Sequence, residues 1–544
     1  MDNTIAAPPA PRNEPPLEFA PASPERLGLS RALEALSRGP TDVPARIDDR
    51  AVVEGESRGE QRVPHRHEQL AARFPLLGDA AVGSAIDGAL RAHRAWAAAR
   101  WEDRAAIFLR AADLATGRRR FLLDAATMLG QGKTVFQAEI DAVCEMADFW
   151  RIQVPLLARI LADQPPGSPH EWTRMDYRPL EGFVLAVSPF NFTAIAGNLS
   201  TAPLLLGNVV VWKPGSDAVL AAHFVHEILR EAGLPPGVLQ FVPATGETVA
   251  RSALHHPALA GVHFTGSTDT FRGIWKQVGE NVDRYRSFPR LVGETGGKGF
   301  VFAFPDADPD ALRVALIRGA YEYQGQKCSA ASRAYLPKSL WDRLRPRLVE
   351  EIQSIPMGDV EDLRNFMGAV INRQAFERLR DRIERARTDP AVSIVAGGQT
   401  DGRVGWFVRP TLIRTSDPKH ALMQEELFGP VLTLFVYDDH SEEDALELCA
   451  GTSPYALTGA VFGADRRRLR LAEDRLRWSA GNFYLNDKPT GAVVGRQPFG
   501  GGRASGTNDK GGSLLNLLRR AGARTIKENL SPPTEWSYPH MRTE

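Results

Sequence analysis

The feature that most restricts the fold of this chain is an alternation of short apolar runs with helical segments between residues 183 and 303. The apolar runs, which we interpret as strands, occupy residues 183–187, 208–212, 239–242, 261–264, 290–292 and 300–303, with helices expected at 217–232 and 271–282. Strands that alternate with helices form a parallel sheet with helices on both faces. The pattern therefore predicts an α/β domain with a doubly wound parallel sheet.

A second α/β series follows between about residues 308 and 480. Helical periodicity predicts helices at 311–323, 340–354 and 373–387, and strands are expected near 393–396 and 431–437. Residues 80–160 also have a helical pattern. Because 544 residues have room for several domains, we expect a second α/β unit beside the first.

Composition and charge argue against several classes of function. The 66 basic and 66 acidic residues give a formal net charge of zero, which offers no support for binding nucleic acid or a membrane surface. Three cysteines are too few for a disulfide framework and fit a reducing compartment. The histidines and cysteines have no metal-ligand spacing, so no metal site is expected.

The N-terminal segment is rich in Pro and Ala and lacks the apolar core of a secretory signal. Its acidic residues Asp2, Glu14 and Glu18 also argue against a mitochondrial transit peptide. We therefore expect a disordered tail over residues 1–24 and a cytoplasmic protein.

Cys328 and Glu294 are the candidate nucleophile and base. Cys328 lies in Gly-Gln-Lys-Cys-Ser-Ala, and Glu294 lies 34 residues earlier, where a β run ends before Thr-Gly-Gly. Most cysteines are small buried hydrophobic residues, but here small neighbours admit a substrate and Lys327 is expected to lower the thiol pKa. A loop carboxylate is often merely solvated, whereas the end of a strand in an α/β sheet favours a functional role. The pair predicts covalent thiol catalysis.

Other candidate residues lie near the ends of predicted strands. Gly266-Ser267 opens a helix whose N–H groups could hold a phosphate, although no Gly-x-Gly-x-x-Gly occurs here and an ordinary turn remains the alternative. Lys213 could contact a ribose or phosphate, or lie on the surface as most lysines do. Asn191 could donate to an oxyanion or form a turn. Glu426, beside a second glutamate, faces either solvent or a ribose diol.

Together these motifs resemble the aldehyde dehydrogenase superfamily from about residue 20 to residue 541. The narrower similarity is to its Δ1-pyrroline-5-carboxylate dehydrogenase subfamily, which oxidises glutamate γ-semialdehyde to glutamate. It rests on residues 137–141 (Gln-Ala-Glu-Ile-Asp), 195–199 (Ile-Ala-Gly-Asn-Leu), 325–330, 481–488 (Gly-Asn-Phe-Tyr-Leu-Asn-Asp-Lys), 497–501 (Gln-Pro-Phe-Gly-Gly) and 504–510 (Ala-Ser-Gly-Thr-Asn-Asp-Lys). The resemblance implies the α/β aldehyde dehydrogenase fold, with two doubly wound parallel-sheet domains, cofactor and catalytic, and a small β oligomerisation arm.

The resemblance also implies domain boundaries. Residues 25–170 and 184–296 would form the NAD-binding domain, residues 297–500 the catalytic domain, and residues 171–183 and 505–544 the oligomerisation arm. A strand at 524–529 would cross to the neighbouring subunit of a homodimer or larger homo-oligomer. Residues 52–66 match the family poorly.

The family pattern assigns roles in the reaction. Cys328 would attack the aldehyde carbon, Asn191 and the Cys328 backbone N–H would hold the oxyanion, and Glu294 would activate the water that releases the acid. The residues implied to bind NAD are Ser188, Phe190, Lys213, Ser216, Gly266, Ser267, Glu426 and Phe428. Ser216 stands where many relatives have a ribose-binding glutamate, so the choice of NAD over NADP rests on the usual preference of the subfamily.

The residues implied to bind glutamate γ-semialdehyde are Glu139, Phe192, Ser329, Gly491, Ala492 and Phe499. Backbone N–H groups at a glycine suit a carboxylate without adding a mobile charge. The alternative, a succinate semialdehyde dehydrogenase, is expected to use a basic residue instead. A retired enzyme kept as a binding protein is disfavoured because nucleophile, base and oxyanion donor are all present. In proline catabolism, a proline dehydrogenase on a separate chain is the expected partner.

Overall fold

The structure is a computed structural model that describes residues 7–542. Five strands of the alternating segment, up to residue 294, belong to a seven-stranded sheet, whereas the run at 300–303 becomes β12 of the second sheet. The strand order is β11-β10-β7-β8-β9-β2-β3, in which the first five strands are parallel and the last two are antiparallel additions. Almost every residue of β7 and β8 is buried. The predicted doubly wound sheet is therefore confirmed. The strands are β2 (Ala45–Ile47), β3 (Arg50–Val52), β7 (Phe183–Val187), β8 (Val209–Lys213), β9 (Leu239–Phe241), β10 (Leu259–Thr265) and β11 (Arg290–Glu294).

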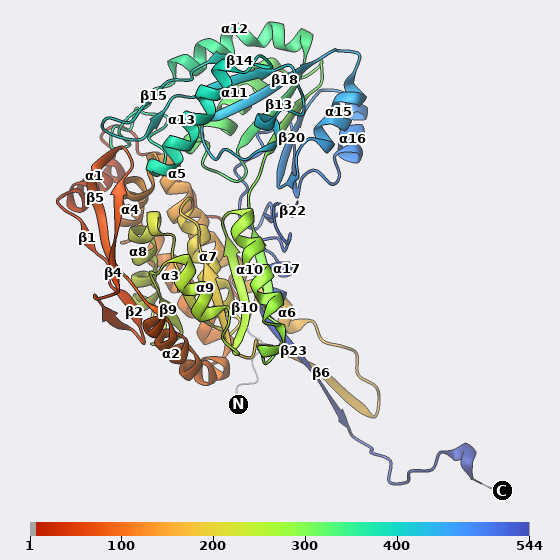
Figure 1. Ribbon diagram of the computed structural model, residues 1–544. Helices are drawn as coiled ribbons and strands as arrows, with labels where there is room; N and C mark the ends of the chain where they lie inside the picture. Colours follow the sequence, from red (N-terminus) through yellow and green to blue (C-terminus); the bar gives the residue numbers. More distant parts are fainter. Residues whose placement is uncertain (1–6, 543–544) are drawn as a thin grey trace.

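Helices cover both faces of this first sheet (Figure 1). Side chains fix several of their starts: the Ser267 hydroxyl accepts a hydrogen bond from Thr270 N at 3.1 Å where α10 begins. The helices are α2 (Asp79–Ala98), α3 (Trp101–Thr116), α4 (Arg120–Gln131), α5 (Val135–Ala138), a π-helical stretch (Glu139–Glu145), α6 (Met146–Ala162), α7 (Thr193–Leu205), η2 (Ser216–Ala218), α8 (Val219–Glu231), α9 (Gly246–Ala253), α10 (Thr268–Glu280) and η3 (Val282–Arg284).

The second α/β series forms another seven-stranded sheet, ordered β14-β17-β18-β13-β12-β20-β21, in which all strands but β14 are parallel. Its strands are β12 (Gly299–Ala303), β13 (Ala331–Pro337), β14 (Val392–Ala396), β17 (Thr411–Thr415), β18 (Val431–Tyr437), β20 (Thr458–Phe462) and β21 (Asn482–Leu485). The helices around it are α11 (Pro309–Tyr321), η4 (Glu322–Gly325), α12 (Lys338–Ser354), α13 (Arg373–Thr388), α14 (Ala421–Gln424), α15 (Glu442–Gly451) and α16 (Arg466–Arg475).

Short strands complete this domain: β15 (Thr400–Asp401) pairs with β16 (Phe407–Val408), and β19 (Tyr455–Ala456) pairs with β22 (Gly502–Arg503). Within residues 7–542, no helix combines the length and the apolar character that crossing a bilayer requires.

The segment that matched the family poorly is a β-hairpin. Strand β4 (Ser57–Val63) pairs antiparallel with β5 (Arg66–Leu76), and β1 (Thr41–Asp42) joins β5 as a third strand. Alternate residues of β4 are buried, because one face of the hairpin packs on the helices of the first domain.

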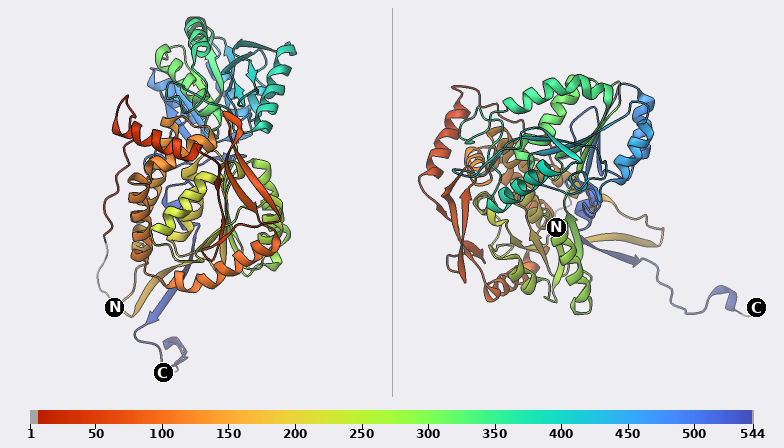
Figure 2. Two further views of the ribbon diagram at one scale, coloured as in Figure 1. Left: turned by 90° about the vertical axis from the view of Figure 1, so that its left-hand side faces the viewer. Right: turned by 45° about the horizontal axis from the view of Figure 1, so that its top comes forward.

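The N-terminal segment corrects one expectation. A disordered tail was predicted for residues 1–24; residues 1–6 lie outside the described part, but residues 7–23 run along the helices of the first domain up to α1 (Pro24–Ser37) (Figure 2). Phe19 is buried with Leu29 and Met128. Apolar burial and ion pairs hold a segment whose Pro- and Ala-rich composition gave no sign of them.

Two long strands form an arm that projects from the body (Figure 1). Strand β6 (Glu171–Pro179) pairs antiparallel with β23 (Ala521–Asn529), which contains the strand expected at 524–529; η5 (Pro539–Met541) follows near the C-terminus. Residues 505–520, assigned to the arm from the sequence, lie instead against the body. Helix α17 (Leu514–Leu518) contributes Leu517 to the first core, and Ser505 pairs with Thr295.

Candidate active site

The candidate catalytic residues meet where parallel strands of the two sheets end. Asn191 follows β7, Glu294 ends β11, and Cys328 lies in the turn between η4 and β13. The ends of neighbouring parallel strands lie on one edge of a sheet, where α/β proteins bind ligands. The structure therefore brings together three residues that are far apart in the sequence.

The backbone around Cys328 is tightly constrained. Tyr323, Gln324 and Gly325 have φ values of 52°, 56° and 65°, a left-handed turn that leads into the cysteine loop. A Cβ at Gly325 would overlap the Gly429 carbonyl, and one at Gly297 would overlap the Cys328 carbonyl. Both glycines are needed because other backbone approaches the loop so closely.

The Cys328 thiol is partly exposed, and its pKa is raised by burial and by the nearby Glu426 and Glu294 carboxylates. The expectation that Lys327 lowers this pKa is wrong. The Lys327 ammonium lies 3.3 Å from the Glu322 carboxylate and forms an ion pair with it instead of with the thiolate. The thiolate must therefore be generated when ligands bind or a base acts.

Glu294 is a partly exposed carboxyl group with one free oxygen. Its Oε2 is buried and has no hydrogen-bond partner among residues 7–542. Burial raises its pKa well above the ordinary value, opposed by the Gly501 backbone and by Lys510. A carboxyl of raised pKa is a stronger base once it has lost its proton. Glu294 is thus suited to take a proton from water.

Asn191 is attached directly to the cysteine loop. Its buried side-chain amide donates a hydrogen bond to the Gln326 carbonyl at 3.1 Å, two residues before Cys328. Gln326 is held in turn, because its Oε1 accepts from Ile371 N at 2.9 Å. An amide group has two N–H donors, so Asn191 keeps a second one for an oxyanion.

A buried ion pair supports the backbone just after Asn191. Asp141 accepts hydrogen bonds from Thr193 N at 2.9 Å and Ala194 N at 2.8 Å, at the start of α7. The same carboxylate accepts from Lys133 Nζ at 2.6 Å, and both side chains are fully buried. Asp141 therefore neutralises Lys133 and caps α7 in place of an N-cap side chain. Sequence reasoning assigned no role to either residue.

Two of the expected cofactor residues lie next to Cys328. Glu426 Oε1 accepts from Gly297 N at 2.7 Å, and burial raises its pKa to about 7. Phe428 has a φ of 53°, and its ring meets the Phe190 ring edge-on at 5.7 Å. Glu426 and Phe428, with Lys327, line a small hollow beside the cysteine loop.

The other expected cofactor residues follow β7, β8 and β10. Burial lowers the Lys213 pKa, opposed by the Asp217 carboxylate. Ser216 is exposed, and Gly266 precedes the exposed Ser267 at the N-terminus of α10. Ser188 differs, because its Oγ accepts from Trp212 Nε1 at 3.0 Å and is directed into the protein. The set combines an ammonium group and a helix N-terminus for phosphates with the Glu426 carboxylate for a ribose diol.

Residues expected to bind substrate lie on the other side of Cys328. Ser329 Oγ is 2.7 Å from Thr490 Oγ1, which places it beside Gly491 and Ala492. Gly491 is exposed with a φ of 94°, a conformation that favours glycine. The other two candidates, Phe192 and Phe499, have partly exposed aromatic side chains. The centroid of the Phe192 ring lies 4.0 Å from Lys133 Nζ.

Glu139 does not reach this site. It is fully buried, Arg120 binds its carboxylate as an ion pair, and Leu17 N donates to it at 2.8 Å. One residue that sequence reasoning missed is Glu145, at the end of the same π-helical stretch, whose carboxyl interacts with Lys133 and Lys327. Burial raises its pKa to about 8, reinforced by the Asp141 charge. The helix carries several acidic residues, and only packing decides that Glu139 pairs with Arg120 while Glu145 lies near Lys133 and Lys327.

One group in the described part of the chain has the spacing of metal ligands: His65, Asp359 and Glu361. The Arg66 guanidinium forms ion pairs with both carboxylates. The group is therefore neutralised by an internal cation.

Comparison with known proteins agrees with this geometry. The model of the aldehyde dehydrogenase family matches residues 52–518. A Bos taurus protein named delta-1-pyrroline-5-carboxylate dehydrogenase, mitochondrial, is 48% identical over 531 residues, 97% of this chain and 94% of its own. The structure named Delta-pyrroline-5-carboxylate dehydrogenase from Mycobacterium tuberculosis bound with NAD is 51% identical, with a TM-score of 0.96 over 100% of both chains. Proline utilization A from Bdellovibrio bacteriovorus is 30% identical with a TM-score of 0.90, covering 97% of this chain and 55% of that one.

The comparison overturns the cytoplasmic expectation. Relatives from Bos taurus, Mus musculus and Dictyostelium discoideum all carry the word mitochondrial in their names. The acidic, Pro-rich composition of the N-terminal segment was therefore a poor guide to compartment.

Proposed function

Because the chain belongs to the aldehyde dehydrogenase family, we propose that Cys328, Glu294 and Asn191 carry out its NAD-dependent reaction. The enzyme oxidises L-glutamate γ-semialdehyde, the open form of Δ1-pyrroline-5-carboxylate, to L-glutamate in proline catabolism. The observation that carries the residue assignment is the meeting of a partly exposed thiol, an amide donor and a carboxyl of raised pKa at one strand edge.

In the first step Cys328 Sγ bonds to the aldehyde carbon as the thiol loses its proton to a base. The carbonyl oxygen becomes an oxyanion, which the second Asn191 N–H and the Cys328 backbone N–H stabilise. When bound, NAD accepts the hydride that leaves this carbon. Cys328 is then a thioester of the oxidised substrate.

In the second step Glu294 removes a proton from water, and the hydroxide adds to the thioester carbonyl. The carbon–sulfur bond breaks, which frees the acid and returns Cys328 to its resting state. The same oxyanion donors act again. Glu294 can accept this proton only in its deprotonated form. The raised pKa then makes its carboxylate a stronger base.

The side chains fit the dinucleotide. Lys213 and the N–H groups at the start of α10 offer positive charge for hydroxyl and phosphate oxygens, with Ser267 and Ser216 beside them. Glu426 offers a carboxylate to ribose hydroxyls, and Phe428 and Phe190 offer an aromatic surface. Gly266 belongs to the proposed NAD-binding residues because it precedes Ser267 at the start of α10. We expect Ser188 to act only by supporting the end of β7.

For the substrate, we propose that Ser329 and the backbone N–H groups of Gly491 and Ala492 hold the carboxylate. The 2.7 Å contact between Ser329 and Thr490 supports this, since it ties the loop to the cysteine turn. Phe192 and Phe499 would border the aliphatic chain. Glu139 is dropped from the set because its carboxylate is already paired.

We also propose that the β6–β23 arm joins two copies into a homodimer or larger assembly. Most residues of β23 are exposed, and Trp172 on β6 is 61% exposed on this projecting two-stranded arm. A proline-oxidising enzyme is the expected upstream partner. The similarity to proline utilization A supports this link.

The test is NADH formation by the purified protein with glutamate γ-semialdehyde and, in parallel, succinate semialdehyde. We expect rapid turnover of the first substrate, and loss of it in Cys328→Ala by at least about a thousandfold, because no other residue supplies the nucleophile. Cys449→Ala, which removes a buried thiol elsewhere, is the matched control and should stay active. Preference for succinate semialdehyde would overturn the carboxylate anchor but not the thiol chemistry.

A further inference from the structure

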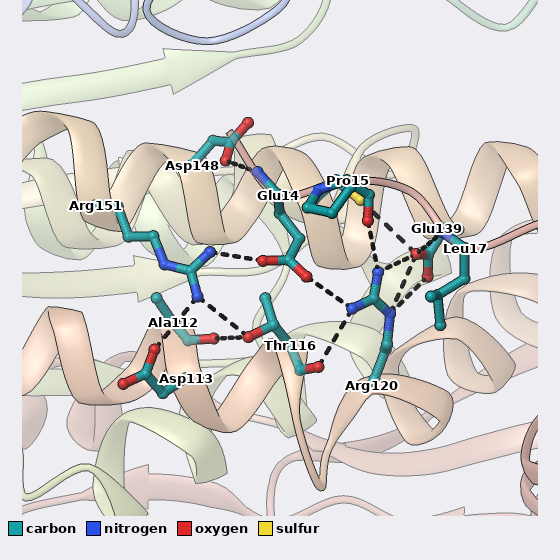
Figure 3. A network of polar contacts seen from close by, with 11 residues as sticks. Glu14, Pro15, Leu17, Ala112, Asp113, Thr116, Arg120, Glu139, Asp148 and Arg151 are labelled. Carbon is teal, nitrogen blue, oxygen red and sulfur yellow. Dashed lines mark hydrogen bonds and ion pairs between the residues drawn. The ribbon is translucent and has the colours of Figure 1, made fainter. Parts of the chain in front are cut away.

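An N-terminal segment, residues 13–17, is bound across the helices that lead to the active site (Figure 3). We call these residues the strap. The strap has no helical or strand structure, so its position depends on side-chain contacts and on Phe19, which is buried just beyond it. None of the catalytic or cofactor residues lies on it.

Glu14 anchors the strap through two guanidinium groups. Its Oε1 accepts from Arg120 Nη1 at 2.8 Å, and its Oε2 accepts from Arg151 Nη1 at 2.7 Å (Figure 3). Its backbone N donates to Asp148 Oδ1 at 2.7 Å. Arg120 also pairs with Glu139. The strap is therefore bonded on both sides of Glu145 in the sequence, to Asp148 directly and to Glu139 through Arg120.

Asn13 connects the strap to a distant loop. Its Nδ2 donates to Asp148 Oδ2 at 2.7 Å and to the Val494 carbonyl at 2.9 Å. Its Oδ1 accepts from Arg496 Nε at 3.1 Å. Val494 and Arg496 are close in sequence to Gly491 and Ala492, the proposed anchor of the substrate carboxylate.

Within the loop of residues 490–497, Arg496 N and Gln497 N donate to the Val493 carbonyl and Val493 N donates to Gln497 Oε1, and other contacts attach the loop to the body. Thr490 is tied to Ser329, and Gly495, with a φ of 80°, lies so close to Ile152 that a Cβ would meet it at 2.8 Å. Val494 is buried and packs beside Gly512. A loop without regular structure keeps its backbone donors aimed only if such contacts fix it.

We propose that the strap sets the position of the carboxylate-anchor loop, and that Asn13 is the positioning residue that makes the enzyme favour aldehydes bearing a carboxylate. This inference rests on the proposed function of Gly491 and Ala492. Asn13 touches neither substrate nor cofactor and acts through the Val494 carbonyl and Arg496.

The experiment compares wild type with Asn13→Ala, the equally sized Asn13→Leu, and Glu18→Ala, an exposed neighbour, as control. Steady-state kinetics are measured with glutamate γ-semialdehyde and with propionaldehyde, which has no carboxylate. Both Asn13 variants should lose about fivefold to tenfold in kcat/KM for the first aldehyde, mainly through KM, because its hydrogen bonds to the loop are lost. For propionaldehyde, and for the KM of NAD, the change should stay within about twofold.

Equal losses with both aldehydes would mean a general structural defect and would overturn the proposal, as would no loss with either. Thermal unfolding of each variant checks that the fold persists at the assay temperature. A wild type without turnover of glutamate γ-semialdehyde overturns both the proposed function and the strap. An active wild type with unchanged Asn13 variants overturns the strap alone.

Discussion

Two polar clusters, one around Cys328 and one behind Asn191, differ in how far their charges and hydrogen-bonding groups are paired. The reaction cluster (Cys328, Glu294 and Glu426) has an unpaired hydrogen-bond acceptor, because Glu294 Oε2 has no partner within residues 7–542. The pKa of all three groups is raised. The support cluster (Lys133, Asp141 and the first residues of α7) satisfies its charges and donors with one another.

The difference shows which polar groups the fold pairs with one another and which it leaves without a partner. A buried polar atom without a partner is costly, and a ligand or water that binds Glu294 Oε2 would remove that cost. The support cluster is the converse case, in which paired charges fix one backbone geometry around Asn191. Whether that pairing serves stability, and whether the unpaired acceptor serves chemistry, can be tested separately.

The largest effect is expected from breaking the support cluster. Asp141→Ala removes the carboxylate that neutralises the fully buried Lys133 and caps α7, which should lower the free energy of unfolding by about 3–5 kcal/mol. Chemical denaturation measures this directly. Asp269→Ala is the matched control, because the Asp269–Arg272 pair is exposed and should contribute under about 1 kcal/mol. Similar losses in the two variants would contradict a supporting role for Asp141.

The oxyanion donor should matter for rate rather than for stability. Asn191→Ala should reduce kcat by about 100-fold to 1,000-fold, since one donor to the oxyanion is lost while Cys328 and Glu294 remain. Steady-state kinetics with saturating substrate give this value. Asn281→Ala removes a buried asparagine at the C-terminal end of α10, just after the helix, and should leave kcat unchanged. If Asn191→Ala retained full kcat, the oxyanion assignment would be wrong.

The smallest effect concerns pH. Burial raises the Glu426 pKa to about 7, so the carboxyl is mostly protonated at pH 6 and ionised at pH 8. The ionised form accepts hydrogen bonds from ribose hydroxyls more strongly. NAD should therefore bind up to about tenfold more tightly at pH 8 than at pH 6.

Calorimetric titration of NAD at both pH values checks this prediction. In Glu426→Gln the side chain cannot ionise, so the dependence on pH should disappear, at the weaker affinity. A wild-type affinity that fell from pH 6 to pH 8 would show that another group controls binding.

Several parts of the fold and site followed from local sequence. The predicted strand at 183–187 coincides with β7, because an apolar run signals a buried strand directly. The strand at 524–529, which the family resemblance implied, lies inside β23. Residues 57–76 escaped prediction, since two of the three alternating buried positions of β4 are Gly59 and Gln61, so the apolar alternation of a half-buried strand is missing. The N-terminal segment was misread because its ordering comes from Arg120 and Arg151, more than 100 residues away.

By itself, the sequence determined the family and the two α/β domains, and it pointed to Cys328, Glu294 and Asn191 as the proposed catalytic residues, because chemistry restricts which residue types can fill those roles. The tertiary structure alone decided how each group is set: that Lys327 pairs with Glu322 instead of activating the thiol, that Glu139 pairs with Arg120 while Glu145 interacts with Lys133 and Lys327, and that Asp141 holds the start of α7. The reason is physical. Burial, charge pairing and pKa depend on neighbours brought together by folding, and spacing along the chain does not specify them.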